Sequence, residues 1–84
     1  MTYDDIRNYL QNIFGENSAQ VEELNIFIEC KSKFIDNQND NTLLDMQSAY
    51  VNIYETLKIL CFCGKKELPV DKFYSFVACL KADL

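Results

Sequence analysis

The spacing of apolar and polar residues along the chain predicts four amphipathic helices. In the first segment, apolar residues recur every three or four positions and share one side of a helix: Tyr3, Ile6, Leu10, Ile13 and Phe14. Thr2 followed three residues later by Asp5 is a variant of the capping box that begins many helices. Gly15 is typical of the residue that ends one. A helix is therefore expected over about 3–14.

A second helix is expected over about 18–35, with Asn17 or Ser18 as its N-cap. Its apolar face carries residues at helical spacing: Val21, Leu24, Phe27, Ile28 and Ile35. Ile26 is expected to project from the opposite, polar face, where helical spacing gives it no core neighbours. The polar run 36–41 is rich in turn-forming residues and is expected to be a loop.

The third helix is the longest, expected over about 42–63, with Asn41 or Thr42 as its cap and Gly64 as its end. Its main apolar face has the spacing of a heptad seam: Leu43, Met46, Tyr50, Ile53, Leu57 and Leu60. A second apolar set lies on another side of the same helix: Leu44, Val51, Ile59 and Phe62. A helix that is apolar on two sides must be covered on two sides, either by the other helices or by a partner.

A final helix is expected over about 71–83, because Pro69 prevents a helix from continuing through that point and Asp71 can cap a new one. Its apolar face consists of residues at helical spacing: Phe73, Phe76, Val77, Leu80 and Leu84. The alternation of period two that marks strands is not sustained anywhere. The sequence therefore predicts an all-α fold, one small four-helix domain over 1–84, packed as an antiparallel bundle with the long third helix at its centre.

Composition and charge narrow the kind of partner. The chain has 84 residues, 49% of them apolar and 25% charged, which is typical of a single globular domain. Its net charge is −5, and the whole excess lies in residues 1–40, which hold eight acids and three bases. Such a surface disfavours direct binding to nucleic acid or to an anionic membrane, and it favours a protein partner with a basic surface.

The chain also lacks the usual signs of export and of catalysis. Asp4 and Asp5 stand where a signal peptide would carry basic residues, so a cytoplasmic protein is expected. There is no histidine, which excludes Cys–His and Ser–His pairs, and neighbouring carboxylates such as Glu22 and Glu23 diverge on a helix. We therefore expect no enzymatic activity.

No cofactor or metal is expected either. The run 36–41 lacks the central glycine of a calcium loop. The four cysteines lack the paired spacing of a zinc site and are expected to be reduced thiols that contribute to packing: Cys30, Cys61, Cys63 and Cys79.

Two surfaces are candidates for binding a protein. The first is an acidic stripe on the polar side of the second helix and at the adjoining chain segments: Glu22, Glu29, Asp36, Asp40, Asp4 and Asp5. Ile26 would be an apolar anchor within it. Immunity proteins, antitoxins and phage anti-defence inhibitors are commonly of this size and charge. The main expectation is therefore an inhibitor that neutralises a basic, nucleic-acid-acting protein by occupying its surface.

The alternative is the second apolar set of the third helix. If the other helices leave it open, it would pair with a copy of itself or with a partner helix, and the protein would be a homo-oligomeric adaptor or regulatory subunit, such as a homodimer. The simpler interpretations are that the acidic stripe is only the solvated side of an amphipathic helix, and that the other helices cover both apolar sides of the third one.

Overall fold

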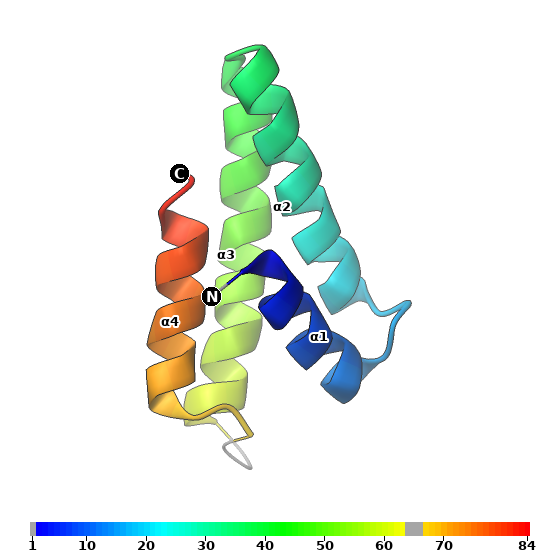
Figure 1. The fold of residues 1–84 in the computed structure, drawn as a ribbon, viewed down its shortest axis with the longest axis vertical. Helices are drawn as coiled ribbons and strands as arrows, with labels where there is room; N and C mark the ends of the chain where they lie inside the picture. The colour runs from blue at the N-terminus through cyan, green and yellow to red at the C-terminus, as the bar shows by residue number, and fades with distance from the viewer. Residues whose placement is uncertain (1, 64–66) are drawn as a thin grey trace.

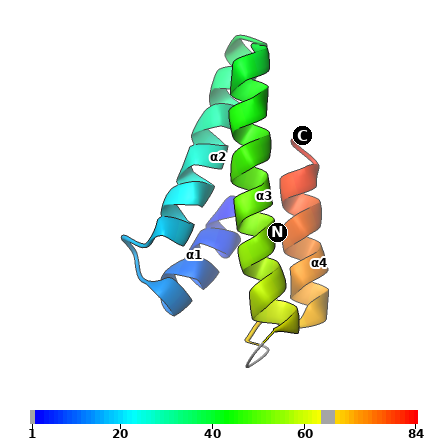
Figure 2. The same cartoon turned by 180° about the vertical axis from the view of Figure 1, so that it is seen from behind.

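The computed structural model describes residues 2–63 and 67–84, and these form four α-helices joined by short connections (Figure 1). The helices are α1 (Tyr3–Phe14), α2 (Ala19–Asp36), α3 (Asp40–Phe62) and α4 (Val70–Lys81). α2 and α3 form an antiparallel pair with the largest contact in the molecule, and α4 runs back along the other flank of α3 (Figures 1 and 2). The prediction of an all-α, antiparallel four-helix domain with the long third helix at its centre is confirmed.

The core lies on the side of α3 where the three other helices gather. Every buried residue in the described part of the chain is apolar. The largest fully buried side chains come from all four helices and from the α3–α4 connection: Ile6, Leu10, Leu24, Phe27, Met46, Leu57, Leu68 and Leu80. Because burial of one such side chain contributes about 1.5–3 kcal/mol, this shared core is the main stabilising feature of the fold.

The first two helices begin as predicted. The carboxylate of Asp5 accepts a hydrogen bond from the backbone N–H of Thr2 at 2.9 Å, which fixes the first turn of α1. At the start of α2, the hydroxyl of Ser18 accepts from the backbone N–H of Val21 at 3.3 Å. In each case a side-chain oxygen accepts a hydrogen bond from a backbone N–H that has no partner within the helix.

The last two helices begin slightly earlier than predicted, α3 at Asp40 and α4 at Val70. The side chain of Asn39 accepts from the backbone N–H of Asn41 at 2.8 Å, so α3 begins two residues before Thr42 and the loop shortens to 37–39. The polar run offers several side chains able to cap, and Asn39 is the one used. α4 begins directly after Pro69, and Asp71 lies inside its first turn, where a carboxylate interacts favourably with the helix dipole. Gly64, the predicted end of the third helix, lies outside the described residues.

The predicted apolar face of α2 needs two corrections. Ile35 is 68% exposed, and Ile26 is half-buried and packs against the core. The buried residues of α2 follow one another at steps of three: Val21, Leu24, Phe27 and Cys30. Each step of three falls about 60° short of a full turn, so the buried face rotates around the helix. This rotation brings Ile26 against the core and leaves Ile35 outside it.

Two apolar residues at helix ends also lie further from the core than predicted. Phe14, at the end of α1, is 37% exposed, and Leu84, which follows the end of α4, is 45% exposed. Helical spacing places both on apolar faces, but Phe14 is the last residue of its helix and Leu84 lies beyond the end of α4.

A polar contact joins the two ends of the described chain. The hydroxyl of Tyr3 donates a hydrogen bond to the carboxylate of Asp83, which also lies 3.1 Å from the ammonium group of Lys31. That ammonium group is 5.0 Å from the centre of the Tyr3 ring, within the range of a cation–π interaction. The contact ties α1 and the segment after α4 to the middle of α2.

The turn between α1 and α2 depends on Gly15. Its backbone has φ +98° and ψ 156°, a combination that is open essentially only to glycine. No atom lies within 4 Å of the position that a Cβ would occupy, so a larger residue would meet backbone strain without a steric clash.

We predict that Gly15→Ala lowers the free energy of unfolding by about 1–3 kcal/mol, because alanine is strained at this backbone conformation. Urea denaturation followed by circular dichroism measures the change. Glu16→Ala, at the next exposed position of the same turn, is the matched control and should stay within about 0.5 kcal/mol of the wild type. Equal midpoints for Gly15→Ala and the wild type would contradict the prediction.

Candidate functional site

The side of α3 that faces away from the other helices carries an open apolar surface. The buried residues of α3 all lie on its inner side: Met46, Ala49, Ile53, Leu57 and Cys61. The second apolar set lies on the opposite side, here called the outer face, and each member is about half exposed: Leu44 59%, Val51 51%, Ile59 56% and Phe62 49%. Figure 2 shows that no helix passes over this side of α3. The interpretation that the other helices cover both apolar sides is therefore wrong.

Shorter polar side chains separate the apolar ones along the outer face. A shallow hollow of about 420 Å³ lies at its middle, and its lining comes from α3 alone: Gln47, Ser48, Val51 and Asn52. Leu44 precedes this hollow by one turn, and the exposed Glu55 and Lys58 follow it. The outer face is thus a line of large apolar side chains with a depression at its centre.

At its C-terminal end the outer face continues onto α4. The ring of Phe62 stands edge-on to that of Phe73, with 5.2 Å between the ring centroids. Phe73 in turn lies 5.4 Å from the ring of Tyr74, which is 62% exposed, and Val70 in the same turn of α4 is also exposed. The apolar surface therefore spans two helices at this end.

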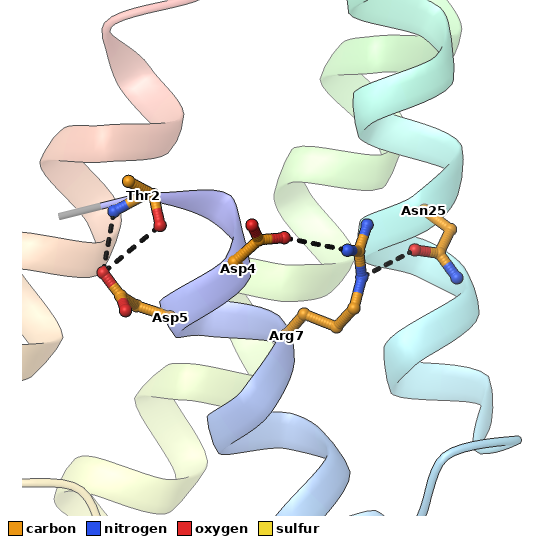
Figure 3. Close-up of polar contacts among 5 residues, drawn as sticks. All are labelled: Thr2, Asp4, Asp5, Arg7 and Asn25. Atoms are coloured by element: carbon orange, nitrogen blue, oxygen red, sulfur yellow. Dashed lines mark hydrogen bonds and ion pairs between the residues drawn. The ribbon is translucent and has the colours of Figure 1, made fainter.

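The six carboxylates of the acidic stripe are all exposed, but they do not form one group. Three of them follow the outside of α2 at intervals of seven residues: Glu22, Glu29 and Asp36. Arg7 connects Asp4 to this side, because its guanidinium lies 3.0 Å from the Asp4 carboxylate and donates to the Asn25 side-chain oxygen of α2 at 3.2 Å (Figure 3). Asp5 points away from α2 on the other side of α1 (Figure 3).

Basic side chains of the same chain form ion pairs with two acids of the acidic stripe. Each basic residue of the segment 1–40 contacts a carboxylate: Arg7 with Asp4 at 3.0 Å, Lys33 with Glu29 at 3.3 Å and Lys31 with Asp83 at 3.1 Å. Within the described residues, Glu22, Asp36 and Asp40 have no ion pair. Ile26, the predicted apolar anchor, gives part of its surface to the core. Within the described residues, Asp5 has no ion pair either and instead accepts hydrogen bonds from Thr2, so four acids of the stripe have no ion pair.

A second hollow, of about 290 Å³, lies between α1 and α4, and no pattern in the sequence predicts it. Its lining combines polar and aromatic side chains: Asp5, Asn8, Tyr9, Asn12, Lys72 and Phe76. The ring of Tyr9 stands edge-on to that of Phe76, with centroids 5.7 Å apart. Burial raises the pKa of the Tyr9 hydroxyl, and the negative charges of Glu67 and Cys61 raise it further. No motif marks this hollow, because its residues come from two helices about 60 positions apart.

The cysteines do not form a metal site in the described part of the chain, where no three potential ligands of the His, Cys, Asp or Glu type come together. Cys30 and Cys61 are buried, whereas Cys63 is exposed at the end of α3. Burial raises the pKa of the Cys30 thiol, and the charge of Asp45 adds to the effect. Cys30 therefore forms its reactive thiolate only at a higher pH than an exposed cysteine does.

We predict that, in the folded protein at pH 8, a disulfide reagent such as DTNB modifies Cys63 before it modifies Cys30. Cys63 is exposed, and the raised pKa of Cys30 lowers its thiolate fraction at this pH and moves its reactivity to higher pH. The release of the coloured thiolate measures the rates. Cys63→Ser should remove the fast phase, and Cys30→Ser should keep it. A fast phase that survives Cys63→Ser and disappears in Cys30→Ser would contradict the prediction.

Comparisons with known proteins give no relative: no protein family matches the sequence, and no curated protein or solved structure matches the chain. Among the helices that the structure describes, none combines the length and the apolar character needed to cross a membrane. A functional assignment therefore depends on the surfaces of this chain itself.

Proposed function

We propose that this protein acts by binding another polypeptide chain through the outer face of α3. The observation that carries the proposal is the line of four half-exposed apolar side chains along one side of a 23-residue helix. A single exposed apolar residue is ordinary, but an aligned set is typical of a protein-binding surface. The complementary structure is an amphipathic helix, which presents its own apolar residues at matching intervals.

The size of the hydrophobic contribution shows why the four residues act as a set. Covering roughly 100 Å² on each half-exposed side chain contributes about 2.5 kcal/mol per residue at 25 cal/mol/Å². Association itself costs about 4–15 kcal/mol in lost freedom of motion. One or two of these side chains could not hold a partner, whereas four of them, together with the apolar side chains of the partner, can offset this cost.

The acidic stripe supports a second candidate function, inhibition of a protein with a basic surface in the manner of an immunity protein, antitoxin or phage anti-defence protein. The supporting observation is the charge distribution: the excess of five acids lies entirely in residues 1–40, and Glu22, Asp36 and Asp40 are exposed. A negative surface of this kind accelerates encounter with a Lys- and Arg-lined groove.

We place this second candidate behind the outer face for two reasons. Lys33 and Arg7 already contact Glu29 and Asp4, which weakens the negative field of the stripe. Ile26 packs against the core, so the stripe has less apolar area at its centre than the sequence suggested. Neither surface surrounds a substrate with converging reactive groups, and we propose a binding function without catalysis.

We predict that a photo-crosslinking residue such as benzoylphenylalanine at Val51 forms an adduct with a polypeptide in the host cells. The reason is that Val51 lies at the middle of the outer face. Introducing Leu44→Glu and Ile59→Glu into the same chain should abolish the adduct, because both charges disrupt the apolar line on either side of Val51. Denaturing gel electrophoresis and mass spectrometry measure the products.

Two further positions for the crosslinker complete the experiment. Ser75, exposed on α4, is the control and should give no adduct. Glu22 reports on the acidic stripe. Adducts at Glu22 with none at Val51 would favour the inhibitor function and overturn the proposed use of α3.

A further inference from the structure

We propose that the polypeptide covering the outer face of α3 is a second copy of this chain, packed antiparallel about a two-fold axis at Val51. The inference rests on the proposed function, since it names the occupant of the same surface. Three observations support it: the apolar area of the face, the distribution of charge over the molecule, and the order of residues along α3.

The apolar area matches what one partner contributes to a stable interface. An interface of standard size buries about 800 Å² on each side, of which somewhat more than half, about 450 Å², is apolar. The four half-exposed side chains of the outer face provide about 400 Å² at roughly 100 Å² each. In a symmetric dimer both sides bring this same area, so the interface needs no other apolar surface.

The charge distribution allows two copies of an acidic protein to meet at this face. Residues 41–62 of α3 carry only two acids and one base: Asp45, Glu55 and Lys58. The excess of five acids belongs to residues 1–40, whose eight acids lie on α1, in the turn after it, on α2 and at the very start of α3. Contact through the outer face therefore brings together a nearly neutral segment of each copy and keeps most of the negative charge of the two copies apart.

The order of charges selects the antiparallel arrangement. Asp40 and Lys58 are 18 residues apart, which is five full turns, so they lie on the same side of α3 near its opposite ends. In an antiparallel pair, equivalent flanks face each other, and Lys58 of each copy comes near Asp40 of the other. A parallel pair would instead place Lys58 against Lys58 and Glu55 against Glu55, which is unfavourable.

The positions of the side chains fit a two-fold axis at Val51. With Val51 opposite its own copy, Glu55 comes opposite Gln47, whose side-chain amide can donate to the carboxylate. Lys58 then comes opposite Leu44 of the other copy, and its aliphatic stem covers apolar surface there. Its ammonium group reaches toward the carboxylate of Asp40 in that copy, one turn further along the helix. The hollow lined by Gln47, Ser48, Val51 and Asn52 lies at this axis and provides room for the facing Val51.

Sedimentation equilibrium of the purified full chain tests the proposal. The chain mass is 9.8 kDa, and we expect a concentration-dependent shift to twice this value between about 1 and 200 µM that persists in 0.5 M salt, because the contact is mainly apolar. Val51→Glu should give a monomer at all these concentrations, with an unchanged helical circular dichroism signal and thermal midpoint.

Ile35→Glu is the matched control, since Ile35 is equally apolar and 68% exposed but lies on α2. This variant should dimerise like the wild type. A wild type that stays monomeric at 200 µM, or a Val51→Glu variant that dimerises as well as the wild type, would overturn the proposal.

A charge exchange tests the antiparallel register. Lys58→Glu should weaken the dimer about five- to tenfold at low salt, because it places two acids together at each end of the interface. Adding Asp40→Lys to the same chain should restore most of the affinity. If the double variant is weaker than Lys58→Glu alone, the antiparallel pairing is wrong.

The crosslinking experiment separates failure of this inference from failure of the proposed function. An adduct at Val51 with the mass of two chains supports the second copy. An adduct of any other mass, together with a monomeric purified protein, overturns the second copy while the binding function of α3 stands. The absence of any adduct at Val51, together with a monomeric protein, overturns both.

Discussion

The constraint on which this structure depends is that three helices must share one core with a fourth, longer helix that is apolar on two sides. Each of α1, α2 and α4 has one principal apolar face, and it can be buried only where the others also bury theirs. All three therefore gather on one side of α3, around Phe27, Met46 and Leu57. This leaves the opposite side of α3 without a neighbour in the described fold, and both the core and the outer face follow from this arrangement.

The helices themselves could be predicted from the sequence, because their signals are local. The spacing of apolar residues, Ser18 as a cap and Gly15 as a breaker each act within a few positions of the chain. What failed depends on contacts between helices. A helical wheel assumes that one fixed side is buried, whereas the buried face of α2 rotates from Val21 to Cys30 between its two neighbours. For this reason Ile26 packs against the core and Ile35 is exposed, which is the reverse of what their spacing predicts.

The candidate surfaces show the same division between local and long-range information. The apolar residues of the outer face were identified from their spacing, but their exposure depends on where three other helices pack. The acidic stripe was identified from its repeat of seven, but Arg7 reaches Asn25, and Lys31 reaches Asp83, only through the tertiary fold. The hollow between α1 and α4 has no sequence signal, because each helix supplies only isolated polar residues to it.

The contact of Tyr3 with Asp83 and Lys31 has a consequence for how the chain is made. It joins residues 80 positions apart, so it can form only after the whole segment between them has left the ribosome. The α2–α3 hairpin, whose contacts are close in sequence, can assemble earlier and provide the surface on which α1 and α4 later dock. During this interval the outer face of α3, and the part of its inner side that α4 later covers, are open to other nascent chains. The order of synthesis therefore gives a neighbouring chain on the same messenger RNA an opportunity to meet α3 before the fold is complete.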